Sequence, residues 1–175
     1  MGVEASWVRD HIRAIEDYPE PGVTFRDITP LLGDAAAFGR AVDDLVTRFH
    51  DVDVDRVVGV ESRGFILAAP VAYRLRSGFV PVRKPGKLPW AVAREEYDLE
   101  YGRDKLEIHR DAIHPDENIL IVDDVLATGG TASATGRLVE TLGGNIVGFG
   151  FLLEIKNLGG RARFDGRRVE SLTAF

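Results

Sequence analysis

The run from Ile119 to Thr135 constrains this chain more than any other segment. It begins with Ile-Leu-Ile-Val, an unbroken apolar stretch that indicates a buried strand of a parallel sheet. Two carboxylates, Asp123 and Asp124, follow the apolar residues, and the small turn Ala127-Thr-Gly-Gly-Thr131 comes soon after them. An apolar strand rarely ends in paired acids unless something uses them, so a plain strand, turn and helix without a ligand is the weaker interpretation.

The composition of the turn 127–131 and its place before a predicted helix indicate an anion-binding site. A helical repeat at positions 131, 135, 138 and 142 predicts that a helix begins directly after it and ends at Gly143-Gly144. Backbone amides at a helix N-terminus attract negative charge, and Gly129 and Gly130 let the backbone close around a phosphate. The acidic pair beside the turn suits ribose hydroxyls or a bound cation. Together these features predict a sugar-phosphate site.

Two common nucleotide-binding patterns are absent from the sequence. A nucleoside-triphosphate P-loop requires Gly-Lys-Ser/Thr at the start of its helix, whereas Gly130 is followed directly by Thr131. No Gly-x-Gly-x-x-Gly follows a strand, which excludes the dinucleotide fingerprint.

Composition narrows the class of protein further. The chain has 175 residues, 45% of them hydrophobic, which suits one domain with a substantial core. It has no cysteine, which favours a reducing compartment, and we expect a cytoplasmic protein. No apolar run is long enough for a membrane span, and a net charge of -6 argues against a nucleic-acid partner. Against this background, the basic cluster Arg83, Lys84 and Lys87 points to a small anion. Its alternative is a solvated loop.

Strands and helices are predicted to alternate. Apolar patterns indicate a first helix capped by Ser6 and carrying Trp7, Ile12 and Ile15, then a helix over 35–50, a strand over 56–60, a helix over 66–75 and strands over 79–82, 146–153 and 168–172. This order predicts a single α/β domain, residues 1–175, with a central, mainly parallel sheet flanked by helices. From 84 to 110 the periodicity fails, so this segment is predicted to be an irregular lid with short extended pieces at 97–99 and 106–108.

The candidate residues all follow predicted strands. Glu61 to Gly64 follow the strand 56–60, Arg83 to Lys87 follow 79–82, and Asp123 to Thr131 follow the signature strand. Ligands of such sheets bind beyond the carboxyl ends of the strands, so we expect the three segments to meet. The four histidines are scattered without metal-ligand spacing and are interpreted as structural or surface residues.

The signature segment resembles the phosphoribosyl-pyrophosphate motif of the type I phosphoribosyltransferases, with four apolar residues, two acids and a Thr-Gly-Gly-Thr loop. Other stretches are similar to the adenine phosphoribosyltransferases of that group: Pro21-Gly-Val-Thr-Phe-Arg-Asp-Ile-Thr29, Val60-Glu-Ser-Arg-Gly-Phe65, Val82-Arg-Lys-Pro-Gly-Lys-Leu-Pro89, and Tyr97-Asp-Leu-Glu-Tyr-Gly102 with Leu106-Glu-Ile108. The resemblance covers nearly the whole chain. It implies the type I phosphoribosyltransferase fold with a mobile lid, and conversion of adenine and phosphoribosyl pyrophosphate to AMP and pyrophosphate. It also implies Mg²⁺ with few direct protein ligands and a homodimer, in which one basic residue completes the neighbour's site.

The resemblance also implies a role for each site residue. Asp123 and Asp124 would bind the ribose hydroxyls beneath the developing cation, and Glu100 would handle a proton at the imidazole edge of the base. The 5-phosphate would be bound by Ala127, Thr128, Gly129, Gly130 and Thr131. Pyrophosphate would be bound by Glu61, Ser62, Arg63, Gly64, Arg83, Lys84 and Lys87, with a cis peptide between the first two. Adenine would be bound by Thr24, Phe25, Arg26, Val125 and Tyr101. The alternative for Phe25 is a core anchor.

Lys156 leaves a second purine open. The 6-oxopurine phosphoribosyltransferases use a lysine after a comparable strand, so the runner-up is an enzyme for hypoxanthine, guanine or xanthine. The context Glu154-Ile-Lys-Asn-Leu-Gly-Gly160 resembles the adenine branch better. A non-catalytic regulator that senses phosphoribosyl pyrophosphate is the third interpretation, and such regulators carry a DNA-binding extension for which we expect no room here.

Overall fold

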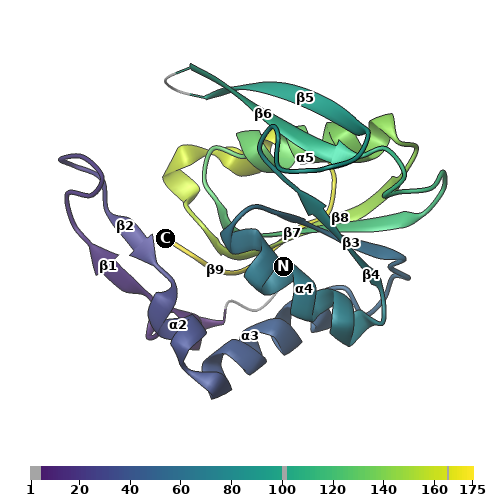
Figure 1. Cartoon of the computed structure of the whole chain (residues 1–175). Coiled ribbons are helices and arrows are strands. Elements are labelled where there is room, and N and C mark those ends of the chain that lie inside the picture. The colour runs from purple at the N-terminus through teal and green to yellow at the C-terminus, as the bar shows by residue number, and fades with distance from the viewer. Residues whose placement is uncertain (1–4, 100–101, 165) are drawn as a thin grey trace.

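The computed structural model describes residues 5–99, 102–164 and 166–175, and a five-stranded parallel sheet lies at its centre (Figure 1). The strand order is β4-β3-β7-β8-β9. The strands are β3 (Arg56–Val60), β4 (Gly78–Val82), β7 (Asn118–Leu126), β8 (Asn145–Glu154) and β9 (Val169–Ala174). β3 pairs with β4 on one side and β7 on the other, so Val60 lies opposite Val82 and Gly59 opposite Val122. The predicted α/β fold is confirmed.

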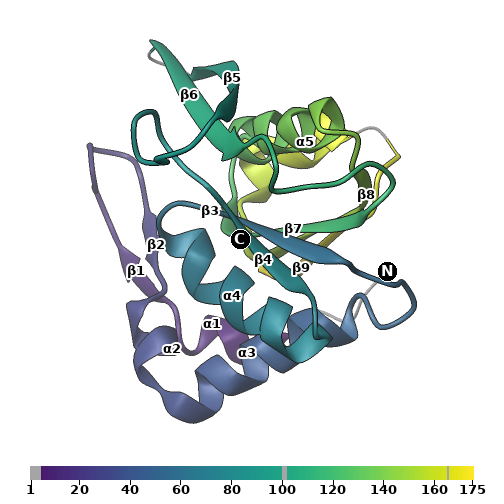
Figure 2. The ribbon, with the colours of Figure 1, turned by 45° about the vertical axis from the view of Figure 1, so that its right-hand side comes forward.

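Helices cover both faces of the sheet (Figure 2). α3 (Ala35–Thr47) and α4 (Arg63–Leu75) pack on one face, and α5 (Gly130–Thr141) packs on the other. The apolar run of β7 supplies both cores because side chains alternate along a strand. Ile119 and Ile121 join the α5 side, whereas Leu120 and Val122 join the α3–α4 side, and all four are fully buried.

The N-terminal segment forms a small hairpin instead of the predicted long helix. α1 (Ser6–Arg9) is a single turn without a side-chain cap, and β1 (Arg13–Ile15) pairs antiparallel with β2 (Phe25–Asp27). α2 (Thr29–Gly33) follows. The helix prediction was wrong because Ile15 pairs with the main chain of Phe25, and such non-local pairing overrides a weak helical pattern.

The segment predicted to be irregular, 84–110, is mostly a second hairpin. β5 (Val92–Leu99) and β6 (Gly102–His109) pair in register from Val92 opposite His109 to Leu99 opposite Gly102, and the hairpin lies over α5 (Figure 1). Ala93 and Tyr97 are buried, and charged residues separate them. Because these charged residues interrupt the alternation of apolar and polar side chains, the sequence pattern did not indicate a strand here. Glu100 and Tyr101 lie outside the described residues.

The remaining elements are two 3-10 turns, η1 (Lys156–Leu158) and η2 (Gly160–Phe164). They follow β8 and pass behind the start of α5, where η2 contacts that helix. No helix within the described ranges has the length and apolar character needed to cross a membrane.

Candidate active site

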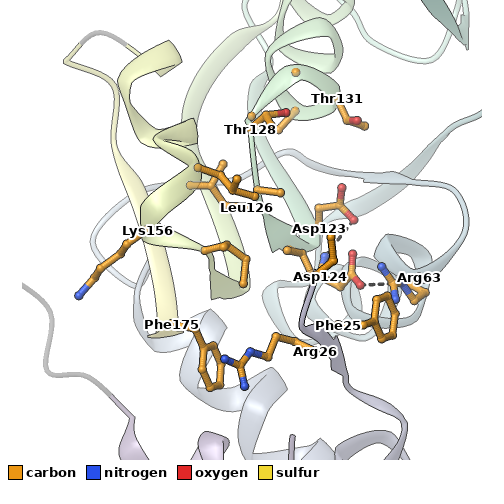
Figure 3. Close-up of a pocket in the computed structure, with 18 of the residues that line it drawn as sticks. Phe25, Arg26, Arg63, Asp123, Asp124, Leu126, Thr128, Thr131, Lys156 and Phe175 are labelled. Carbon is orange, nitrogen blue, oxygen red and sulfur yellow. Dashed lines mark hydrogen bonds and ion pairs between the residues drawn. The ribbon is translucent and has the colours of Figure 1, made fainter. Parts of the chain in front are cut away.

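A cavity of about 1160 Å³ opens at the carboxyl edge of the sheet, and Figure 3 shows its wall. Its lining comes from 22–26 in the β1–β2 hairpin, 61–63 after β3, 123–132 at the end of β7, 155–158 after β8, and Phe175. The predicted meeting of the segments after β3 and β7 is therefore observed. Parallel topology brings them together, because both strands end at the same edge.

The two acids at the end of β7 have different surroundings. Asp124 is 5% exposed, and its Oδ2 lies 2.7 Å from Nε of Arg63, although this oxygen accepts no hydrogen bond of good geometry. Asp123 Oδ1 accepts the backbone N–H of Asp124 at 2.9 Å. Burial, and then the neighbouring charge of Asp124, raise the pKa of Asp123 well above its ordinary value. The pair is thus short of positive charge, and a ligand cation or hydroxyl donors would relieve it.

Gly64 brings the start of α4 against Asp123. A Cβ atom at position 64 would lie 2.6 Å from Asp123 Oδ1, so no larger residue fits without a shift. Gly64 itself is not among the lining residues, whereas Glu61, Ser62 and Arg63 are. The peptide between Glu61 and Ser62 is cis, as the resemblance implies.

The loop Ala127–Thr131 is fixed from behind by a part of the chain that the sequence did not single out. Gly129 has φ +77° and precedes α5, a conformation that favours glycine. A Cβ atom on Gly160 would lie 2.1 Å from the carbonyl oxygen of Ala127, so the two backbones touch. Arg163 Nε donates to the carbonyl of Thr128 at 2.7 Å. Because a peptide is planar and trans, the amide of Gly129 points away from Arg163.

The β1–β2 hairpin supplies the predicted base-binding residues. Thr24, Phe25 and Arg26 line the cavity, and Val125 lines it from β7. The Phe25 ring is half-buried at the wall, with the guanidinium of Arg63 5.4 Å from its centroid, so it is not one of the buried core residues.

Two contacts at this wall were not foreseen. The guanidinium of Arg26 stacks 4.2 Å from the ring centroid of Phe175, and Figure 3 shows the two side chains together. The only sequence signal for Phe175 was an aromatic residue next to a predicted strand. At the start of α5, the hydroxyl of Thr131 donates to Tyr97 Oη at 3.4 Å and so links the loop to β5.

The basic cluster lies beside the cavity and does not line it. Arg83 Nε donates to Glu61 Oε2 at 2.9 Å, and the backbone N–H of Lys84 donates to Glu61 Oε1 at 2.9 Å. Lys84 Nζ lies 3.1 Å from Asp104 Oδ2, and this hydrogen bond raises the pKa of Lys84. Pyrophosphate binding by Arg83, Lys84 and Lys87 stays a prediction.

Lys156 lies at the rim of the cavity in η1 and is exposed. Figure 3 shows its side chain directed away from Asp123 and Asp124. Its backbone N–H donates to the carbonyl of Phe175 at 2.9 Å. Within the described ranges, no group of three or more His, Cys, Asp or Glu side chains could hold a metal ion.

Known proteins agree with this geometry. The family model of the phosphoribosyl transferase domain matches residues 32–172. The adenine phosphoribosyltransferase of Symbiobacterium thermophilum is 50% identical over 167 residues, which cover 95% of this chain and 98% of that protein. The one from Desulfitobacterium hafniense is 54% identical over 165 residues, 94% of this chain and 95% of that protein.

Solved structures are similar over the same length. The crystal structure of adenine phosphoribosyltransferase from Thermoanaerobacter pseudethanolicus has a TM-score of 0.95 and 47% identity, covering 98% of this chain and 99% of that chain. The enzyme of Saccharomyces cerevisiae, crystallised with adenine and an imino-altritol bisphosphate, has a TM-score of 0.90 and 38% identity, covering 96% and 97%. The chain described here belongs to the adenine phosphoribosyltransferases, a branch of the phosphoribosyl transferase domain family.

Proposed function

We propose that this protein transfers the phosphoribosyl group of phosphoribosyl pyrophosphate to adenine, which yields AMP and pyrophosphate. The observation that carries the proposal is the union of an acidic pair and a glycine-packed loop in one cavity, facing an aromatic wall. The relatives named adenine phosphoribosyltransferase support the choice of adenine. We further propose that the protein acts in the cytoplasm as a homodimer.

The ribose ring lies over Asp123 and Asp124. Breaking the bond between C1′ and pyrophosphate leaves positive charge on the ring, and fixed negative charge beneath it lowers the barrier. The hydroxyls donate to the two carboxylates. The raised pKa of Asp123 supports this role, because an uncompensated buried carboxyl gains most from donors and from a developing cation.

The 5-phosphate is bound by the backbone amides of Ala127 to Thr131 and by the hydroxyls of Thr128 and Thr131. The start of α5 adds the positive end of a helix dipole. The contact between Arg163 and the carbonyl of Thr128 supports this arrangement, since it leaves the amide of Gly129 free on the other side of the loop.

Adenine packs between Phe25 and Val125, and backbone groups of Thr24 and Arg26 bind its edge. A carbonyl that accepts from the 6-amino group rejects a 6-oxo purine, because two acceptors would then face each other. Glu100 and Tyr101 bind the base from the lid. Glu100 takes and returns the proton of the imidazole edge, a role proposed from the resemblance alone.

The residues present fit magnesium that enters with its substrate. Asp123 and Asp124 offer oxygen ligands, which Mg²⁺ prefers, but within the described ranges no third His, Cys, Asp or Glu joins them in a metal-binding group. Phosphate and hydroxyl oxygens of the substrate, with water, would complete its coordination. When bound, the ion neutralises charge on the pyrophosphate leaving group. Arg83, Lys84 and Lys87 add positive charge for that group, one of them in the neighbouring subunit.

One experiment tests the reaction. The protein is incubated with phosphoribosyl pyrophosphate, Mg²⁺ and, in turn, adenine, hypoxanthine, guanine and xanthine, and nucleotide and pyrophosphate are measured. We expect the highest kcat/KM with adenine. Faster turnover of a 6-oxopurine would favour the alternative that rests on Lys156, whereas no turnover with any base would favour a sensor of phosphoribosyl pyrophosphate.

A further inference from the structure

Glu107 is a buried carboxylate to which the proposed reaction gives no role. It lies in β6 and is 1% exposed. Its Oε2 accepts the backbone N–H of Gly86 at 3.0 Å, and its Oε1 accepts from Arg94 Nε at 2.6 Å. Its own backbone pairs with that of Arg83 in both directions, at 2.9 and 2.7 Å. Gly86 and Arg83 belong to the turn 83–87, and Arg94 belongs to the neighbouring strand β5.

Glu61 holds the same turn from the other side. Its carboxylate accepts from the side chain of Arg83 and from the backbone N–H of Lys84. Arg83 also donates from Nη1 to the carbonyl of Lys87 at 3.5 Å and so spans the turn. The turn is therefore held between two carboxylates: Glu61 lies in the cavity wall, and Glu107 is buried in strand β6 of the hairpin.

The ion pair of Glu107 with Arg94 lets Glu107 hold the turn without using up the turn's own positive charge. A buried carboxylate is tolerated when a cation and hydrogen bonds compensate it, and Arg94 supplies that cation from outside the turn. Glu107 therefore fixes the turn through a backbone amide without neutralising Lys84 or Lys87. In the described part of the chain no carboxylate ion pair involves Lys87, so its ammonium is available to a ligand.

We propose that Glu107 is a positioning residue for the leaving group: it holds the Arg83–Lys87 turn in the shape that binds pyrophosphate. This inference rests on the proposed function. Replacing Glu107 by glutamine leaves one carbonyl oxygen in place of two carboxylate oxygens, so either Gly86 or Arg94 would lose its acceptor and the turn could move. The affinity for the pyrophosphate end of the substrate would fall, while the adenine side of the cavity would be untouched.

Glu107→Gln and Glu117→Gln form a matched pair. Glu117 also accepts one arginine side chain, Arg56 at 2.7 Å, and one backbone amide, His114 at 2.8 Å. It lies just before β7, at the opposite edge of the sheet from the cavity. Each substitution keeps the side-chain size and removes the charge. Any effect common to both variants reports stability, and only the difference between them reports the turn.

We expect Glu107→Gln to raise the KM for phosphoribosyl pyrophosphate and the inhibition constant of pyrophosphate by about 10- to 100-fold, the usual effect of losing a charged hydrogen bond. The KM for adenine should change by less than about threefold. Direct titration of the protein with magnesium pyrophosphate should give the same loss of affinity. Glu117→Gln should match the wild type in all four quantities.

A second variant covers the case in which Glu107→Gln does not fold. The Arg94 side chain is 66% exposed, so Arg94→Gln removes no core packing; the unpaired Glu107 should lower its melting temperature, and the assays are run below that temperature. It leaves the Glu107 charge without its cation, and the carboxylate would then compete with pyrophosphate for the lysines of the turn. Pyrophosphate affinity should fall again, with adenine unaffected.

Failure of the proposed function and failure of the inference about Glu107 would give different results. If the wild type makes no AMP from adenine, the proposed function fails, and titration with pyrophosphate still tests the role of Glu107. If the wild type is active but pyrophosphate affinity in Glu107→Gln or Arg94→Gln equals that of Glu117→Gln, Glu107 has only a structural role and the inference is overturned.

Discussion

The loop Ala127–Thr131 and the turn Arg83–Lys87 both present anion-binding groups near the carboxyl edge of the sheet, but different forces hold them. The loop is held by close contact between backbones, with Gly160 against Ala127 and no space for one more carbon atom. The turn is held by the carboxylates of Glu61 and Glu107. Close packing fixes a conformation because it has no low-energy alternative, whereas an ion pair can be exchanged for a charged ligand. In the proposed reaction the substrate keeps its 5-phosphate and loses its pyrophosphate, so the turn proposed to bind the leaving group is the one held by exchangeable contacts.

The first way to sharpen this contrast is Glu100→Gln. The variant keeps size and hydrogen bonding but loses the ionisable acceptor, so kcat should fall by roughly 10²–10⁴-fold. Equilibrium binding of phosphoribosyl pyrophosphate should be nearly unchanged, because the packed loop is intact. Normal turnover would make Glu100 a lid residue only and assign the proton to water or to backbone groups.

The second test replaces Asp123 and Asp124, singly, by asparagine. Each should lower kcat by roughly 10²–10³-fold, as for other groups that stabilise transition-state charge. Melting temperature should not fall, because both carboxyls line the cavity and burial of the Asp123 charge does not stabilise the fold. Asp51→Asn, which breaks a surface pair with Arg168, is the control and should keep full activity. A large fall in melting temperature with activity retained would mean that the acids serve the fold.

The third test inserts one carbon behind the loop. Gly160→Ala must displace the carbonyl of Ala127, and overpacking of this kind costs about 1–3 kcal/mol of stability. The KM for phosphoribosyl pyrophosphate should rise about 10- to 100-fold, because the amides move from the phosphate.

Gly39→Ala is the matched control for the third test. Gly39 lies in α3, and the position that a Cβ atom would take there has nothing within 4 Å, so alanine should raise the free energy of unfolding by about 0.5–1 kcal/mol. If Gly160→Ala bound the substrate normally, the loop would be more compliant than its packing indicates.

The last test concerns the pH dependence of stability and involves no change in activity. The pKa of Asp123 is raised in the folded protein above its ordinary value of 3.8, so the folded state binds this proton more tightly than the unfolded state. Protonated Asp123 therefore contributes its full share to the free energy of unfolding below pH 3.8, and this share is lost as pH rises through the folded pKa. The loss is about 1.4 kcal/mol for each pH unit that separates the unfolded and folded pKa values. Asp123→Asn removes this dependence. Its melting temperature relative to wild type should increase from pH 4 to pH 8, and a constant difference would contradict the raised pKa.

The sequence was most informative where the relevant residues are contiguous. The strand, acids, turn and helix of 119–142 follow one another, so local pattern alone predicted that unit and its place at the sheet edge. Gly160 and Arg163 contact the back of that loop, and Phe175 lines the cavity; all three come from the other end of the chain, and only the tertiary fold shows this. Of the β5–β6 hairpin, only the short extended pieces 97–99 and 106–108 were predicted, and its full length and pairing were missed for a related reason. Its charged residues conceal the two-residue period, and its buried side chains face α5, which comes later in the chain.

The position of that hairpin in the strand order has a consequence for its length. β5 and β6 lie between β4 and β7 in the chain, and both of those strands pair with β3. Pairing with β3 therefore fixes the positions of β4 and β7, and the β5–β6 hairpin is an insertion that connects these two fixed strands. Because the entropy of closing a loop grows only with the logarithm of its length, doubling the insertion would cost about 0.6 kcal/mol. The length of this element can therefore change at a small entropic cost while the sheet and the loop Ala127–Thr131 keep their geometry.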